Sequence, residues 1–241
     1  MSRIGLLNEK PLHASLKQWY AQPGDRFEVP VDGFVIDIVR AGVLLEIQTR
    51  HFGAIKSKLA TLVSSHQVRL IYPIAHEKWI VQSPTAGNAF GSRRKSPKRG
   101  RVEDLFREAV AIPRMLAHQN FSLEVLMTRE EETRRYDGRR WRTRGWVTEE
   151  RRLLEVMDRR VFNGPASWLA LLPVFSGPFT SRDLAQAIGV RLDLAQKMTY
   201  SMRQAGLLQP VGKSGRATLY ESSAIHWRTT HRGTEAQSFS L

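Results

Sequence analysis

The sequence contains no cysteine, which excludes disulfide bonds and zinc sites built on thiolates. No apolar run approaches the ~20 residues that a membrane-spanning helix needs, and no signal peptide is visible. We therefore expect a cytoplasmic protein that has no membrane partner. Its 241 residues are enough for one large domain or for two smaller ones, each with its own core.

Acidic residues are few relative to basic ones. The chain has 23 of them against 37 lysines and arginines, which gives a formal net charge of +14. The excess is largest between residues 91 and 165. A nucleic acid is the natural partner of such a chain, and we expect DNA rather than RNA. Simple solubility is the alternative explanation of the charge.

The most informative stretch is residues 33–50, in which two β-branched apolar runs meet at Ala41 and Gly42. This pattern predicts a β-hairpin, and Gly42 supplies the positive φ that a two-residue turn needs. In that register Arg40 pairs with Val43.

Polar side chains interrupt both strands of this predicted hairpin. Because side chains alternate along a strand, Glu46 and Gln48 share one face, while Leu45 and Ile47 lie on the other. The register places Asp37 opposite Glu46, so the three polar side chains should cluster. Two neighbouring carboxylates repel each other unless a cation lies between them, and oxygen ligands favour Mg²⁺ or Mn²⁺.

These residues resemble the PD-(D/E)XK nuclease superfamily, whose pattern is an acid on one strand and acid-x-Lys on the next. Here Asp37 and Glu46 match the two acids, and Gln48 occupies the lysine position. Glu9 matches an acid that the superfamily often places on the preceding helix. The chain departs from the pattern at Gln48 and lacks a proline before Asp37. The resemblance covers roughly residues 5–82.

The resemblance implies a metal-dependent hydrolase of phosphodiester bonds. Gln48 brings no charge, so a basic residue of the following helix would have to compensate, and we expect Lys56 rather than Lys58 to do so. The alternatives to these roles are that Lys56 is simply solvated and that Glu9 only complements the dipole of its helix. His13 is expected to lie at the protein surface or to contact the metal ligands without being a ligand itself. The implied catalytic residues are Asp37, Glu46, Gln48, Glu9 and Lys56, and the implied metal ligands are Asp37, Glu46, Glu9 and the carbonyl of Ile47.

The elements around the hairpin follow the order that the superfamily uses, namely helix, three strands, helix, strand. We therefore expect an α/β (α+β) class, with a restriction-endonuclease-like mixed sheet flanked by helices in residues 1–128. The expected elements are helices over 8–20 and 53–65 and strands over 26–29, 66–73 and 79–81.

The middle of the chain is rich in arginine and lysine. Its composition predicts a mobile basic loop over 83–101, suited to a phosphate backbone, or else a charged linker. A helix over 102–118 and a strand over 121–127 complete the first domain. Residues 129–160 are expected to be an Arg-rich connector containing a helix over 148–161. The loop residues expected to contact nucleic acid are Arg93, Arg94, Lys95, Lys98 and Arg99.

The last part of the chain is predicted to be mostly helical. A helix over 166–175, a helix capped by Ser181 that runs to about 188, a helix over 192–204 and then a β-hairpin are expected. This order resembles the winged-helix family of DNA-binding domains over residues 161–222. That resemblance implies that the longest helix enters the major groove, although such modules also bind proteins. Residues 223–241 lack periodicity and are expected to be disordered. The residues expected to face DNA are Arg191, Lys197, Tyr200, Ser201, Arg203, Lys213 and Arg216.

Two classes of function stay open. The first is a metal-dependent DNA endonuclease of bacterial defence or of a mobile element, acting as a homodimer or within a larger complex. The second is a catalytically inactive nuclease-fold protein that binds DNA as an adaptor or transcriptional regulator. Both classes use basic surfaces, but only the first needs a divalent cation at the hairpin.

Overall fold

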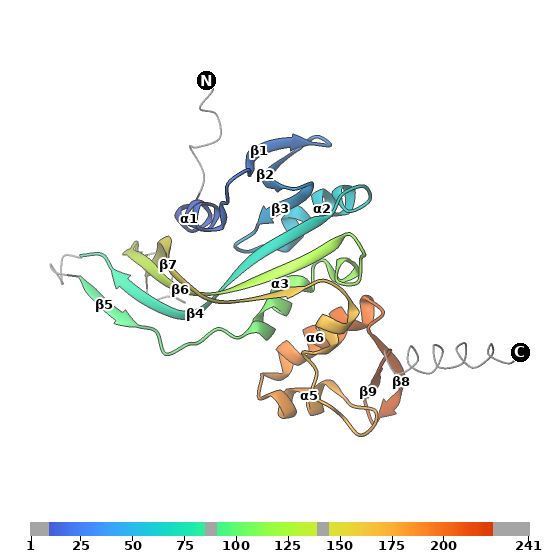
Figure 1. The fold of residues 1–241 in the computed structure, drawn as a ribbon. Coiled ribbons are helices and arrows are strands. Elements are labelled where there is room, and N and C mark those ends of the chain that lie inside the picture. The colour runs from blue at the N-terminus through green and yellow to red at the C-terminus, as the bar shows by residue number, and fades with distance from the viewer. Residues whose placement is uncertain (1–9, 85–90, 139–144, 224–241) are drawn as a thin grey trace, which may run out of the picture.

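The computed structural model describes residues 10–84, 91–138 and 145–223. It is a mixed α+β structure built on one large sheet, in which the strand order is β1-β2-β3-β4-β6-β7 and β5 pairs with β4 (Figure 1). The strands of this sheet are β1 (Arg26–Val31), β2 (Phe34–Arg40), β3 (Val43–Ile47), β4 (Val68–Gln82), β5 (Ser92–Lys95), β6 (Phe121–Tyr136) and β7 (Trp146–Phe162).

Helices cover both faces of the sheet, and a second, two-stranded sheet follows them (Figure 1). None of these helices, within the described residues, is long and apolar enough to span a membrane. The α-helices are α1 (Pro11–Tyr20), α2 (Lys56–Leu62), α3 (Phe106–Ala109), α4 (Pro165–Leu169), α5 (Ser181–Ile188) and α6 (Leu192–Gln204). The 3-10 helices are η1 (Phe52–Ile55), η2 (Val102–Leu105) and η3 (Pro113–Met115). The small sheet consists of β8 (Leu208–Ser214) and β9 (Ala217–Ser222).

The predicted hairpin is confirmed as β2 and β3. Arg40 pairs with Val43, and the two turn residues, Ala41 and Gly42, have φ angles of 47° and 83°. Such a turn matches the twist of the flanking strands. β3 then pairs in parallel with β4, and β4 with β6, so the hairpin is joined to the centre of the sheet.

One face of the sheet is covered by α1. Leu12, Leu16 and Tyr20 of this helix are buried against apolar residues of the sheet that include Ile38 and Leu45. They repeat at helical spacing, which explains why the predicted helix forms here. The first residues of the expected helix, before residue 10, lie outside the described residues.

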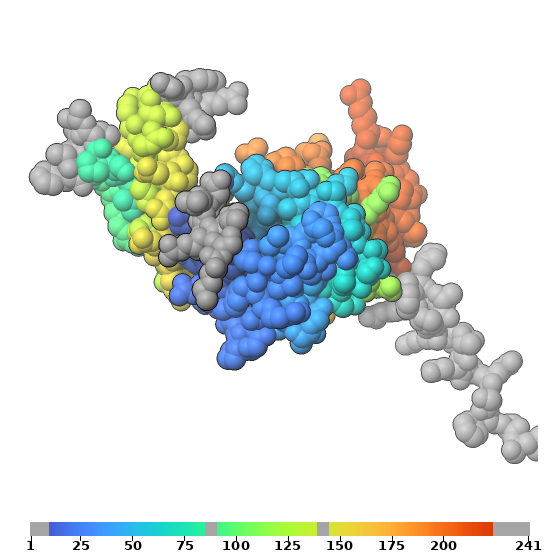
Figure 2. All heavy atoms as spheres, turned by 90° about the horizontal axis from the view of Figure 1, so that it is seen from above, coloured from blue at the N-terminus to red at the C-terminus, as the bar shows by residue number. Residues whose placement is uncertain are grey.

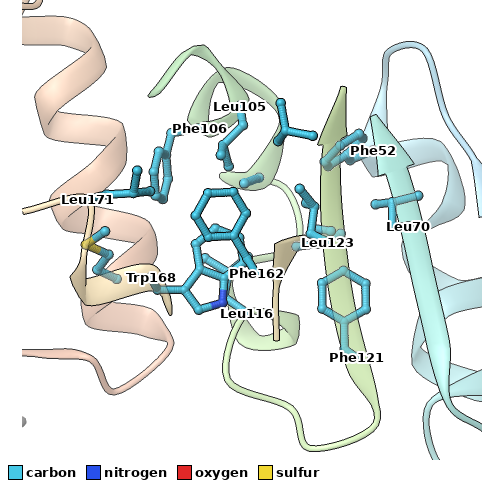
Figure 3. Close-up of a cluster of buried hydrophobic side chains, with 14 of the residues drawn as sticks. Phe52, Leu70, Leu105, Phe106, Leu116, Phe121, Leu123, Phe162, Trp168 and Leu171 are labelled. Carbon is cyan, nitrogen blue, oxygen red and sulfur yellow. The ribbon is translucent and has the colours of Figure 1, made fainter. Parts of the chain in front are cut away.

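The opposite face carries the larger core, which continues without a break into the C-terminal part. Trp168 of α4 stacks on Phe162 with ring centroids 4.4 Å apart and meets Phe106 edge-on, and all three side chains are fully buried (Figure 3). Helix α6 packs on α3 and η3. The sheet and the C-terminal helices therefore share one core.

Two expectations about the middle of the chain are corrected. Residues 66–82 do not form two strands, because β4 is continuous. The pairing of β4 with β6 shifts register between Ala75 and Glu77, and this shift allows the strand to pass through the polar residues at its centre. The helix expected over 102–118 is divided into η2, α3 and η3.

The helix expected over 148–161 is wrong, because these residues belong to strand β7. Its many Glu, Arg and Leu residues favour a helix only weakly, and pairing with β6 outweighs that preference. Leu153 and Val156 face the core beneath α1, while Arg151 pairs with Glu130 of β6. The expected connector over 129–160 therefore consists largely of two sheet strands.

Candidate functional site

Asp37 lies near the middle of β2 and is held from two sides. Its Oδ2 atom accepts a hydrogen bond from the backbone amide of Ile47 at 2.8 Å and lies 3.2 Å from Nε2 of His13 on α1. Lys17, one helical turn further along α1, places its Nζ 3.9 Å from Oδ1. The helix thus brings two basic groups to a largely buried carboxylate.

Glu46 lies next to Asp37 but contacts the opposite helix. Its Oε1 atom accepts a hydrogen bond from Nζ of Lys58 on α2 at 2.6 Å, and Lys58 also donates to the carbonyl of Val35. Its Oε2 atom is buried and has no hydrogen-bond partner within the part of the chain that the structure describes. Glu46 as a whole is only 7% exposed, so water reaches it poorly.

The two carboxylates repel each other. Burial raises the pKa of Glu46, and the negative charge of Asp37 raises it further, to about 7, although Lys58 opposes both effects. Burial also acts to raise the pKa of Asp37, but the hydrogen bond and charge of His13 outweigh it and hold this pKa below its usual range. Near neutral pH Glu46 is therefore partly protonated, while Asp37 stays charged.

Gln48 follows β3 immediately, where its backbone amide donates to the carbonyl of Ile71. Its side-chain Nε2 donates to the carbonyl of Arg50 at 2.6 Å and approaches that of His51 at 3.4 Å. The side-chain amide is thus engaged by backbone carbonyls, and it brings no charge to the carboxylates.

The basic residue that reaches the carboxylates is Lys58, whereas the expected part of Lys56 at the phosphate stays a prediction. Lys56 begins α2 and is exposed, whereas Lys58 points toward β2 and β3. Residues two apart on a helix lie on different faces, so only one of the two lysines can turn toward the sheet. The sequence contains both lysines but not the packing of α2 that decides between them.

One of the expected metal ligands, Glu9, lies outside the part of the chain that the structure describes. Within the ranges described, no group of three or more His, Asp and Glu side chains is arranged to hold a metal ion. The candidate donor set is therefore the carboxylates of Asp37 and Glu46, joined by the carbonyl of Ile47 at the end of β3.

A hollow of about 390 Å³ opens beside these residues. It is lined by His13 of α1 and by the chain that follows β3, including Gln48, Thr49 and Arg50. Neither Asp37 nor Glu46 lines the hollow, and His13 is the lining residue that contacts Asp37.

The basic segment before η2 is not an open loop. Residues 92–95 form β5, and Arg93 pairs with Glu131 at 2.9 Å while covering the ring of Trp79. Lys95 and Arg99 both bond to Glu77, at 2.8 and 3.2 Å. Three of the five residues expected to meet nucleic acid thus pair with two acids, and all five are exposed.

The candidates of the C-terminal part lie on α6 and on the hairpin of β8 and β9. Ser201 is fully buried beside Met198 and Met202, so its expected outward position is wrong. Arg191 is 83% exposed, although Asp193 accepts a hydrogen bond from it. The others that are exposed or partly exposed are Lys197, Tyr200, Arg203, Lys213 and Arg216.

A groove of about 670 Å³ separates α6 from the β8–β9 hairpin. It is lined by Gln196 of α6, Arg216 of the hairpin and Arg182 at the start of α5. Neither Arg182 nor Gln196 was predicted from the sequence to belong to a site. The sequence does indicate a helix start at Ser181, but it does not indicate that the hairpin approaches it.

The segment of the chain that matches a known family has nearly the same ends as α1 and the large sheet together. Residues 10–163, from the residue before α1 to the residue after β7, match the family described as "Domain of unknown function (DUF8091)". The chain belongs to this family.

The similarity to a whole relative extends beyond that segment. A protein described as uncharacterized from Treponema pallidum (strain Nichols) is 32% identical over 222 residues, which cover 90% of this chain and 86% of the relative. No solved structure matches.

Proposed function

We propose that the chain is a metal-dependent DNA endonuclease whose catalytic centre is the pair of Asp37 and Glu46. The observation that carries the proposal is the mutual repulsion of these carboxylates, one of which leaves a buried oxygen without a hydrogen bond among the described residues. A buried acceptor of this kind costs about 1–3 kcal/mol when nothing bonds to it. Ligation of one divalent cation by both carboxylates would offset that cost.

The chemistry follows from the groups around the pair. Hydrolysis joins a water oxygen to phosphorus and breaks the bond to the leaving oxygen, which takes up a proton. A Mg²⁺ or Mn²⁺ ion held by Asp37, Glu46 and the carbonyl of Ile47 would supply Lewis-acid stabilisation to the phosphoryl oxygens.

In the superfamily that this chain resembles, a lysine occupies the position of Gln48. Here Lys58 and Gln48 would together replace that lysine. Lys58 lies 2.6 Å from Glu46 and brings a positive charge that can stabilise the negatively charged transition state. Gln48 can orient the attacking water by hydrogen bonding but cannot supply charge.

The arrangement of elements supports the two resemblances on which the proposal draws. Helix α1, strands β1 to β3, α2 and β4 follow one another in the order expected of a restriction-endonuclease-like fold. Helices α5 and α6 and the β8–β9 hairpin, to which Phe179 adds a bridge at Tyr220, have the order of a winged helix. Such a module would deliver the catalytic centre to DNA.

One observation favours the second function, a catalytically inactive DNA-binding adaptor. His13 and Lys17 lie within 4 Å of Asp37, and Lys58 lies within 4 Å of Glu46, so basic side chains supply much of the charge that a metal ion would bring.

Nicking of supercoiled plasmid with Mg²⁺ or Mn²⁺ tests the proposal. Asp37→Asn and Glu46→Gln should each lower the rate by about 100-fold or more, while DNA binding persists. Asp32→Asn, which removes an exposed carboxylate in the β1–β2 turn, is the matched control and should leave the rate unchanged. Salt-sensitive DNA binding by a wild type that nicks with neither metal would support the adaptor instead.

A further inference from the structure

A second cleft, here called the basic cleft, lies on the sheet face that carries η2. Its volume is about 510 Å³, and it extends from Thr49 after β3 across β4 and β6 to β7. Figure 2 views the molecule from the side of β1 and β2 (blue), beside which the outer ends of β6 and β7 (yellow-green) project. The basic side chains that line the cleft are Arg50, Lys78, Lys98, Arg107, Arg134 and Arg151.

Buried acids fix several of these cations in place. Glu132 accepts hydrogen bonds from Lys78 and from Arg134, each at 2.7 Å, and Arg151 bonds to Glu130 at 2.7 Å. Burial alone would raise the pKa of Glu132, but Lys78 and Arg134 hold it at about 2, so this acid stays charged. The floor of the cleft is therefore preorganised by internal ion pairs.

The rim of the cleft has cations of a different kind. Neither Arg50 nor Lys98 has an acidic partner within 4 Å among the residues that the structure describes, and both side chains are exposed. Their charges are available to an anionic ligand, whereas Lys78, Arg107, Arg134 and Arg151 each bond to an acid.

The backbone around Lys98 is held tightly to β4. The amide of Ser96 donates to the carbonyl of Lys78 at 2.7 Å, and the amide of Gly100 donates to that of Ala75 at 3.0 Å. A Cβ atom at Gly100 would lie 2.5 Å from the carbonyl oxygen of Ala75, so only glycine permits this approach. Lys98 is thus kept at the rim by the two attachments on either side of it.

The basic cleft adjoins the hollow beside Gln48 and His13. Thr49 and Arg50 line both this cleft and the hollow beside Gln48 and His13. A chain of phosphates in the basic cleft would therefore continue past Arg50 into this hollow, where His13 contacts Asp37.

We infer that the basic cleft binds the backbone of a single nucleic-acid strand and guides it to Asp37 and Glu46. The destination of the strand rests on the proposed function, whereas the binding does not. A volume of about 510 Å³ is that of a small-molecule pocket, which is room for one or two nucleotides of a strand. Cations spaced along a groove suit the backbone of one strand.

Binding of a labelled oligothymidylate of about 12 nucleotides, measured by fluorescence anisotropy in EDTA over a range of salt, tests the inference. The double variant Arg50→Ala/Lys98→Ala should bind about 10-fold more weakly, with the salt slope reduced by about 0.7 for each phosphate that is no longer neutralised. The double variant Arg26→Ala/Arg114→Ala removes the same charge from exposed positions outside the cleft and should bind like wild type. Thermal unfolding checks that each variant is folded.

Equal binding of the single strand by wild type and the cleft variant would overturn the inference. A reduction of the same size in the control variant would also overturn it, because net charge alone would then explain the effect. If a duplex of the same length lost more affinity than the single strand, the single-strand assignment would be wrong. Because EDTA removes metal ions, a protein that fails to nick DNA could still give the predicted binding result.

Discussion

At the scale of single residues, Glu46 is the group through which pH should act on this protein. Its pKa is raised to about 7, so the folded state binds the proton more tightly than an unfolded chain does, whose Glu titrates near 4.5. The contribution of this group to stability is therefore fully present below about pH 4.5 and is lost as the pH rises through 7.

Glu46→Gln should consequently stabilise the protein in alkaline solution, because a neutral amide removes the repulsion from Asp37. We expect a gain of about 1–3 kcal/mol at pH 8 and little change at pH 5, measured by urea unfolding. An equal gain at both pH values, or a decrease at pH 8, would contradict the coupling between the two carboxylates.

Lys58 and Lys56 provide a matched pair for the catalytic claim. Lys58→Ala should lower metal-dependent nicking by about 100-fold, because it removes the charge next to Glu46, whereas Lys56→Ala should leave the rate unchanged. The plasmid assay with both variants, each checked for folding, distinguishes them. Comparable reductions in the two would show that Lys58 has no special position.

The residue-scale predictions from sequence succeeded where local geometry decides and failed where packing decides. Alternation along β3 correctly separated Glu46 from Leu45 and Ile47, which lie against α1. The choice between two lysines on a short helix depends on how that helix rotates on the sheet, which the sequence does not encode locally.

At the scale of elements, strong turn and capping signals made the difference. The two-residue turn at Ala41 and Gly42 fixed the β2–β3 hairpin, and the bounds of α6 and the end of α5 were predicted as the structure shows them. The cap of α5 is Thr180, one residue before the expected Ser181. Strand β7 was predicted as a helix because its residues have helical preferences, and its partner β6 decides otherwise.

The start of α5 gives a direct test of capping. The Thr180 side chain accepts a hydrogen bond from the Asp183 amide, and the Asp183 side chain accepts one from the Thr180 amide. Thr180→Ala should lower the free energy of unfolding by about 1–2 kcal/mol in urea titration. Gln186→Ala, at an exposed position of the same helix, should change it by no more than about 0.5 kcal/mol. Equal effects would contradict the capping role.

At the scale of the whole molecule, the sheet and the C-terminal helices share one core around Trp168 (Figure 3). The α+β class was correctly predicted from the order of elements, but this shared core was not, because apolar residues in sequence do not indicate which partner buries them. The contact of α6 with α3 links the candidate DNA-binding helix to the sheet.

Trp168→Ala should therefore destabilise the whole protein, not only its C-terminal part. Removal of its stacking on Phe162 should cost about 3–5 kcal/mol and keep a single unfolding transition, measured by calorimetry. Trp19→Ala, whose side chain on α1 is 45% exposed, is the control and should cost much less. Two separate transitions would contradict the shared core.

Titration calorimetry of Mn²⁺ into the intact protein at pH 7.5 tests the central claim most directly. We predict one ion per chain in the wild type, no detectable binding to Asp37→Asn or Glu46→Gln, and unchanged binding to Asp32→Asn. Absence of binding to the wild type would contradict the account, because His13, Lys17 and Lys58 would then suffice to neutralise the carboxylate pair.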